Sequence, residues 1–256
     1  MALSIEGSHP ATWLGSVAAD IQLGTDCIMN RQPLGYQTAL NVLKLGRAAF
    51  FGDMDADLPP NRSALLRNDD LTPQFGYVGH GYTSTRVLLL GINPGNGRET
   101  INRTVTDARM MPTLIKFAED PSPETFKAAQ QAYQAECSSW HIWRRHCAEI
   151  TGVGKLSLDD IAYSNALPWR TGSESNFSDT VASNAATLYT HPLLDELRPS
   201  VVICLGKRAA AIVRIGDPKL PHMIVWNRAQ AATPSVLSDR RRAAEEVFAI
   251  LGRTRP

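Results

Sequence analysis

Two asparagine residues stand at places in the sequence where their amide groups could do chemistry. Asn93 lies in the turn Gly91–Gly97 that follows the apolar run Arg86–Gly91, and Asn165 ends a second apolar run, Asp160–Asn165. An amide offers a carbonyl acceptor and an NH2 donor, so it can match the polar edge of a nucleobase or hold a water molecule. One asparagine at a strand end is usually a turn or cap residue, so the pair is the informative feature.

The turn that contains Asn93 does not match the common phosphate-binding loops. A Walker A loop needs lysine followed by serine or threonine, where this chain has arginine followed by glutamate. A dinucleotide-binding loop could begin at Gly95, but Thr100 stands in place of its third glycine. We interpret Gly91–Gly97 as a stiff turn, bracketed by proline and glycine, that presents Asn93 above a sheet.

The sequence predicts no metal and no cofactor. Its four cysteines contain no C-x-x-C pair, and no histidine cluster completes a zinc set. The acidic run that begins at Asp53 starts like a calcium loop, but Leu58 and Ala64 occupy the positions of the turn glycine and the bidentate glutamate. Reduced cysteines are expected.

Four short apolar runs predict the strands that position the two amides. They are continuous rather than alternating, which is typical of strands buried on both faces of a parallel sheet. The runs are Arg86–Gly91, Asp160–Asn165, Ser200–Leu205 and His222–Trp226. Helices are predicted at Lys207–Ile215 and Ser238–Leu251, the second with Gly252 as its C-cap. An apolar stripe from Phe126 to Ile150 is predicted to belong to the core.

This alternation of strands and helices predicts an α/β fold. We expect a three-layer α/β/α sandwich with a central, mainly parallel four-stranded sheet in residues 86–256. Residues 1–85 are predicted to form a helical N-terminal extension packed on this core, with helices near Thr12–Leu23 and Gln37–Phe51. Ligands of such sheets bind outside the carboxyl ends of the strands, where both asparagines stand.

Charge is unevenly distributed along the chain. The net charge of the 256 residues is only +1, but Val201–Pro256 holds ten basic and four acidic residues, and the remainder of the chain is correspondingly acidic. A basic C-terminal quarter is compatible with a partner that carries phosphates, and also with a solvated helix face. No long uncharged apolar run is present, so no membrane span or secretory signal is expected, and we predict a cytoplasmic monomer.

Three segments together resemble the uracil-DNA glycosylase superfamily. GINPG at Gly91–Gly95 is similar to its first motif, in the form used by the mismatch-specific uracil- and thymine-DNA glycosylase branch. SNALPWR at Ser164–Arg170 is similar to the strand that carries the base-reading asparagine in several other branches. TPSVLS at Thr233–Ser238 resembles the second motif. The resemblance covers residues 85–252, and its first segment is the most specific.

The chain departs from the superfamily pattern at two places. Thr233 replaces the histidine or asparagine that opens the second motif, and a hydroxyl can form a hydrogen bond but cannot carry positive charge. Residues 96–116 contain no aromatic side chain that could stack on a flipped base. The alternatives for this stacking position are Met110, Met111, Phe75 and Tyr77.

The resemblance implies a DNA glycosylase with DNA as its partner. Such an enzyme flips a pyrimidine into a pocket and hydrolyses its N-glycosidic bond, which leaves an abasic site. By resemblance, Asn93 positions the water molecule and Thr233 assists the departing base as the catalytic residues. Ile92, Gly95 and Asn165 bind the base.

The same resemblance implies a surface that holds distorted DNA through an inserted wedge and phosphate contacts. Ser235, Leu237 and Ser238 are assigned to the wedge loop, with Leu237 as its apolar plug. Arg240 and Arg241 follow one helical turn later, near the phosphates. A solvated basic face is the alternative interpretation of these arginines.

Gly95 bears on the substrate, because the strictly uracil-specific branch has a bulky tyrosine at this position. Without that side chain the pocket is expected to admit a 5-substituent. The predicted bases are uracil, mismatched thymine and 5-modified or hypermodified cytosine, in base-excision repair or in defence against phage with modified DNA. A non-catalytic DNA-binding module that keeps the glycosylase fold is the alternative. A nucleotide-processing α/β protein is a third candidate. The absence of a matching Walker A or dinucleotide-binding loop after Gly91 argues against it.

Overall fold

The computed structural model describes residues 32–52, 72–94, 102–170, 178–216, 218–220, 222–229 and 233–254. Contacts divide the chain into two units, Met1–Pro33 and Leu34–Pro256, and the description that follows concerns the second unit. The helix predicted at Thr12–Leu23 lies outside the described residues. The predicted boundary between residues 85 and 86 falls within the second unit.

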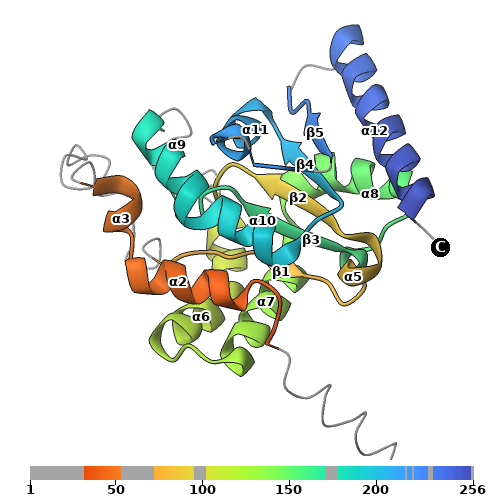
Figure 1. Ribbon diagram of the computed structural model, residues 1–256. Helices are drawn as coiled ribbons and strands as arrows, with labels where there is room; N and C mark the ends of the chain where they lie inside the picture. The colour runs from red at the N-terminus through yellow and green to blue at the C-terminus, as the bar shows by residue number, and fades with distance from the viewer. Residues whose placement is uncertain are drawn as a thin grey trace, which may run out of the picture. The chain divides into compact units, whose positions relative to one another are not determined.

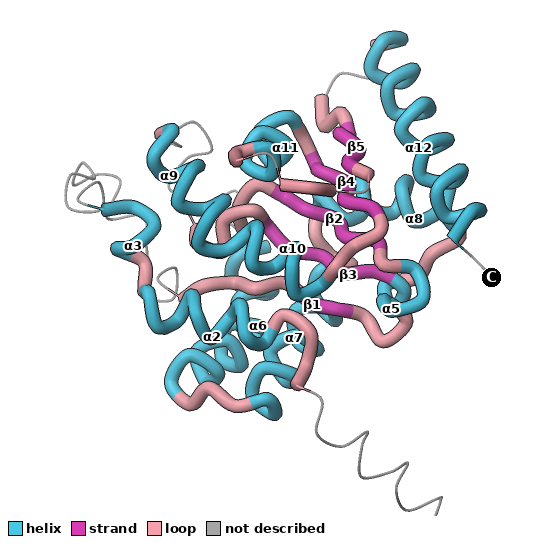
Figure 2. Tube along the Cα trace, in the orientation of Figure 1, coloured by secondary structure: helices cyan, strands magenta, loops and turns pink. Residues whose placement is uncertain are grey.

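The chain folds as the predicted α/β sandwich around a mixed, mostly parallel sheet with the strand order β1-β3-β2-β4-β5 (Figure 2). Strands β2 to β5 pair in parallel, and β1 pairs antiparallel with β3. The strands are β1 (Tyr77–Val78), β2 (Val87–Gly91), β3 (Ile161–Asn165), β4 (Val201–Leu205) and β5 (Met223–Trp226). The four predicted strands are confirmed, and each begins one residue later than predicted.

Burial explains why these strands could be recognised in the sequence. Every residue of β2, β3 and β4 is buried, as a continuous apolar run predicts, whereas β5 at the sheet edge alternates between buried and half-buried residues. The fifth strand, β1, was not predicted, because two residues are too short to carry a periodic pattern.

Helices cover both faces of the sheet (Figure 1). Successive β3 residues point to opposite faces: Ser164 contacts Tyr189, whereas Asn165 contacts Tyr133. The Tyr189 face carries α9 (Asp179–Ala185), η6 (Ala186–Thr190), α10 (His191–Leu197) and α11 (Lys207–Arg214). The Tyr133 face carries α7 (Pro123–Cys137), η3 (Trp143–Cys147), α8 (Ala148–Gly154) and α12 (Pro234–Thr254).

The remaining elements surround this sandwich. They are α2 (Tyr36–Leu45), α3 (Ala48–Phe51), α5 (Tyr82–Thr85), α6 (Asn102–Glu119) and η4 (Leu158–Asp160). Helix α6 packs along α7, and α2 contacts α10 and η6. None of the helices in the described ranges has the length and apolar character needed to cross a bilayer.

Two helix predictions are corrected. The helix predicted at Gln37–Phe51 is broken into α2 and α3 at Gly46, whose φ of +70° ends the first segment. The predicted C-cap at Gly252 is wrong, because α12 continues through this residue to Thr254. Helix α12 also begins at Pro234 rather than at Ser238, since proline fits the first helical position and needs no N–H partner there.

Gly76 should be intolerant of any side chain. Its φ is +77°, and a Cβ would collide with the Tyr163 carbonyl oxygen and lie 2.9 Å from the Ser164 Cα. We expect Gly76→Ala to lower the free energy of unfolding by about 2–4 kcal/mol, measured by urea denaturation.

Gly35→Ala is the matched control for this substitution. Gly35 has a φ of +85°, but the nearest atom to its Cβ would be 3.7 Å away, so only backbone strain of about 1 kcal/mol is expected. Equal losses for the two variants would contradict the close approach at Gly76.

Candidate functional site

The ends of β2 and β3 remain joined beyond the last residue of each strand. Gly91 pairs with Asn165 in the sheet register. After that pair, the Ala166 N–H donates to the Gly91 carbonyl oxygen at 2.8 Å, and the Leu167 N–H donates to the Ile92 carbonyl oxygen at 2.9 Å. The structure therefore brings together the GINPG and SNALPWR segments, which are about seventy residues apart in the sequence.

The Asn165 amide lies directly against Gly91. Its Oδ1 occupies the space that a Cβ on Gly91 would need, so glycine is required here for close approach rather than for its φ. Its Nδ2 donates to the Tyr133 hydroxyl oxygen at 3.4 Å, and Asn165 is only 2% exposed. Burial, with Tyr163 and Cys137 nearby, raises the pKa of Tyr133 well above its ordinary value, so Tyr133 is a neutral phenol that orients the amide.

The structure describes only some of the predicted base-binding and catalytic residues. Ile92, Asn93 and Asn165 meet at adjacent strand ends, all of them buried. Gly95 lies outside the described residues, which leave out 95–101 and 171–177.

Polar contacts from both sides fix the SNALPWR segment. The Thr190 hydroxyl donates to the Ala166 carbonyl oxygen at 2.7 Å, and the Gln74 N–H donates to the Pro168 carbonyl oxygen at 2.7 Å. The Gln74 side chain also faces Arg170, and with its oxygen turned toward the guanidinium it accepts from Nε and Nη2 at 3.2 Å each. Arg170 is 5% exposed, so its charge belongs to the interior of the fold.

Two π-helical turns supply side chains to this part of the fold, and such turns are frequent near functional sites. In η6, Tyr189 contacts the Ser164 hydroxyl oxygen at 2.8 Å and Thr190 holds Ala166. In η3, His146 accepts a hydrogen bond at Nδ1 from the Trp226 indole N–H at 3.4 Å. Both π-helical turns therefore lie beside the carboxyl ends of strands, η6 at β3 and η3 at β5.

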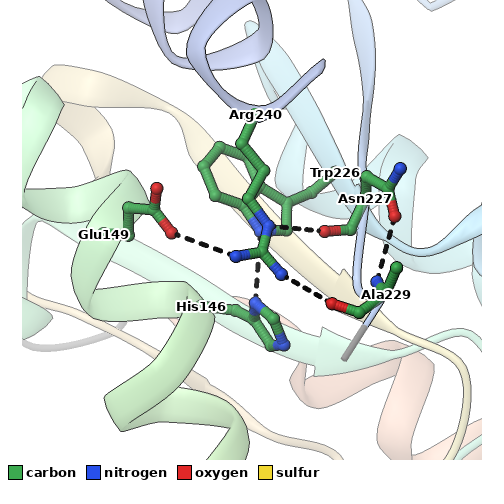
Figure 3. Close-up of polar contacts among 6 residues, drawn as sticks. All are labelled: His146, Glu149, Trp226, Asn227, Ala229 and Arg240. Carbon is green, nitrogen blue, oxygen red and sulfur yellow. Dashed lines mark hydrogen bonds and ion pairs between the residues drawn. The ribbon is translucent and has the colours of Figure 1, made fainter. Parts of the chain in front are cut away.

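Figure 3 shows the cluster around His146 at the end of β5. Arg240 donates through Nε to the Asn227 carbonyl oxygen at 2.9 Å and through Nη2 to the Ala229 carbonyl oxygen at 3.0 Å. Its Nη1 lies 3.9 Å from Glu149 Oε2. Arg240 is 7% exposed, which corrects its assignment as a phosphate contact: its guanidinium holds the loop after β5.

His146 is a neutral imidazole in this cluster. Burial, together with the charges of Arg240 and Arg228, lowers its pKa to about 4. Since Nδ1 accepts from Trp226, the ring proton sits on Nε2. His146 was missed in the sequence, although it falls within the apolar stripe Phe126–Ile150, where a buried histidine is a detectable exception.

The segment TPSVLS forms the start of α12 rather than the loop that the sequence predicted. The Val236 N–H donates to the Thr233 hydroxyl oxygen at 3.4 Å, so Thr233 acts as the helix N-cap. Ser235, Leu237 and Ser238 are exposed in the first turns, and Leu237 is 50% exposed. Arg241 is also exposed, unlike Arg240.

A hollow of about 510 Å³ lies between the ends of β4 and β5 and the helices α11 and α12. Its cationic lining residues are Lys207, Arg228 and Arg242, and its acidic ones are Asp239 and Glu246. The four side chains considered for stacking on a base are all buried, with Phe75 the most exposed at 6%. Within the described ranges, no three His, Cys, Asp or Glu side chains are grouped so as to hold a metal ion.

Comparison of the sequence with models of known protein families and with curated proteins finds no match.

The pKa of His146 predicts a specific response to acid. The folded-state pKa is about 4 and the ordinary value is 6.5, so between these pH values the unfolded chain binds more protons than the folded one. The free energy of unfolding should therefore fall as the pH is lowered from 6.5 toward 4, and be fully restored above 6.5.

His146→Gln should flatten this dependence, measured by urea denaturation at several pH values across the window. His80→Gln is the control, because His80 is exposed and should leave the slope of the wild-type protein unchanged. A slope for His146→Gln as steep as that of the wild type would show that His146 is not buried as a neutral group.

Proposed function

We propose that this chain is a monofunctional DNA glycosylase that hydrolyses the N-glycosidic bond of a flipped pyrimidine. The observation that carries the proposal is that segments far apart in the sequence lie at one edge of the sheet. The segments that resemble glycosylase motifs lie in separate parts of the sequence, yet two of them are hydrogen-bonded at the ends of β2 and β3. The third begins α12, directly after β5 at the same edge of the sheet. Ligands of parallel sheets bind at this edge.

The chemistry assigned to the site needs orientation more than a strong base. In the proposed reaction, water forms a bond to the anomeric carbon of deoxyribose while the base departs with the electrons of the glycosidic bond and takes up a proton. Asn93 aligns the water molecule, since an amide can accept from water and does not ionise near neutral pH. The turn that carries Asn93 is fixed by the bond from Leu167 to Ile92, which favours such a role.

Asn165 is the proposed contact to the base, together with the backbone of Ile92. One Asn165 N–H is used by Tyr133, which leaves the second N–H as a donor to a pyrimidine carbonyl. Tyr133 is then a positioning residue, because it fixes the amide without touching the base. Thr233 caps α12, and its hydroxyl oxygen also lies 3.1 Å from the Ser235 hydroxyl oxygen. With Ser235 as the donor in that pair, the Thr233 hydroxyl hydrogen is available to the departing base.

The surface assigned to DNA lies at the start of α12. Leu237 is half exposed and lies in the first turn of α12, which suits an apolar wedge, and Ser235 and Ser238 are exposed beside it. Arg241 is the proposed phosphate contact, with Lys207 exposed at the start of α11 as a second. Arg240 takes no part in this surface.

The substrate class rests on Gly95, where the absence of a side chain admits a 5-substituent. We propose uracil, mismatched thymine or 5-modified cytosine as the excised base. Removal of such bases would serve base-excision repair or defence against phage with modified DNA.

A non-catalytic DNA-binding module is the second candidate. It is favoured by the burial of both amides, since Asn93 is 8% and Asn165 2% exposed, and by the use of Thr233 as a helix cap. In that case the amides would hold the sheet ends together, and the exposed residues of α12 would bind duplex DNA.

Release of free base separates the two candidates. Duplexes that carry uracil, a thymine mismatch or 5-modified cytosine are incubated with the protein, and released base is measured directly. We expect release from at least one duplex, and a loss of about 100-fold or more in Asn93→Ala with duplex affinity retained. Asn41→Ala, an exposed asparagine on α2, should keep full activity.

Binding without release from every duplex would support the module instead of the enzyme. Neither binding nor release would overturn both. Release that survives Asn93→Ala would keep the glycosylase and remove Asn93 from its mechanism.

Two neighbouring arginines should behave differently. Arg241→Gln should weaken duplex binding about 3–10-fold near 100 mM salt and lower the salt dependence by roughly one phosphate contact, with unchanged stability. Arg240→Gln should instead lower the free energy of unfolding by about 2–4 kcal/mol, because the Asn227 and Ala229 carbonyl groups lose their donor. Fluorescence anisotropy and urea denaturation measure the two effects, and the opposite pattern would contradict the DNA surface assigned above.

A further inference from the structure

The amino-terminal edge of the sheet, opposite the proposed catalytic edge, carries a groove of about 990 Å³. It is formed where β2, β4 and β5 begin, together with α10 and the end of α12. Figure 1 shows α5, which precedes β2, and the C-terminal end of α12 on the same side of the molecule. Neither asparagine of the proposed glycosylase site lines this groove.

The groove has a cationic rim. Arg86, Arg198 and Lys219 line it and are exposed, and Asp195 is the one carboxylate among its described lining residues. The described lining of the groove therefore holds three cationic side chains, two guanidinium groups and one ammonium group, against one carboxylate. Such a charge balance favours an anionic ligand.

The two arginines are held in place by backbone contacts rather than left on mobile loops. The Ser200 N–H donates to the Arg86 carbonyl oxygen at 2.8 Å. The Tyr82 hydroxyl donates to the Leu197 carbonyl oxygen at 3.3 Å, which ties α5 to the end of α10. Arg86 and Arg198 are the residues that follow these two helices, so the contacts bring both cations to one groove.

Both arginines also occupy an unfavourable backbone conformation. Arg86 has a φ of +53° and Arg198 of +48°, at C-cap positions where glycine is the usual residue because it has no Cβ penalty. Glycine does occupy the C-caps of α2 and α3. Two such positions converge on this groove.

The floor of the groove is apolar, with Leu194, Leu220 and Ile250 among its lining residues. A ligand that matches both parts has phosphate groups for the cations and a flat ring for the apolar floor. We propose that this groove binds a nucleotide, either as a free nucleoside phosphate or as the 5′-phosphorylated end of a nucleic-acid strand. The site is independent of the proposed glycosylase activity.

Calorimetric titration of the full chain tests the proposal, with ATP, adenosine and a single-stranded hexanucleotide with and without a 5′-phosphate. ATP should bind at least tenfold more tightly than adenosine at about 50 mM salt, since the phosphate contacts are charge-assisted. Tight binding of the 5′-phosphorylated hexanucleotide alone would identify the strand end as the source of the phosphate. Adenosine binding as tightly as ATP, or no binding of any phosphorylated probe, would overturn the proposal.

Substitutions assign the binding to this groove. Arg198→Gly and Arg86→Gln should each weaken ATP binding about tenfold. Arg198→Gly should leave the unfolding midpoint unchanged or raise it, because glycine relieves the positive φ, so a loss of binding cannot be ascribed to misfolding.

Lys155→Gln is the matched control for these substitutions. Lys155 is a cation with a φ of +51° at the C-cap of α8, but it does not line the groove. Its substitution should leave ATP binding unchanged. Unchanged binding in both arginine variants, or an equal loss in Lys155→Gln, would show that the groove is not the nucleotide site, whatever the outcome of the base-release experiment.

Discussion

The close approach of β2 and β3 at their carboxyl ends is the constraint on which the candidate site depends. Gly91 has no side chain, and the Asn165 amide fills the space that a Cβ would take. This allows the backbones to continue pairing past the strands, through the bonds from Ala166 to Gly91 and from Leu167 to Ile92. The turn that carries Asn93 is thereby fixed to the segment that carries Asn165, and neither could shift without breaking both bonds.

Buried polar groups hold this junction in place from both faces of the sheet. Tyr133 orients the Asn165 amide from one side, and Tyr189 and Thr190 engage Ser164 and Ala166 from the other. A buried polar group without a hydrogen-bond partner lowers the stability of the fold, whereas a buried network in which every group has a partner makes that part of the fold more rigid. The junction is therefore rigid for the same reason that it is stable, which is the property a site that acts by orientation needs.

The arginines of the described residues differ in where the fold places them, although all carry the same charge. Arg240 and Arg170 are buried and serve backbone or amide oxygens, whereas Arg241 is exposed at the start of α12. Arg86 and Arg198 stand at the opposite edge of the sheet. The count of basic residues treats all five alike, although a buried guanidinium fixes a loop and an exposed one is available to an anion.

The sequence by itself determined the α/β class and the four main strands, because continuous apolar runs such as Val87–Gly91 mark strands buried on both faces. It also indicated which edge of the sheet carries Asn93 and Asn165. Only the tertiary structure decided that Arg240 is buried, that His146 is neutral, and that β1 completes the sheet. These properties arise from contacts between residues far apart in the chain, such as Arg240 with Glu149 and Trp226 with His146, and no local pattern of residue types records them.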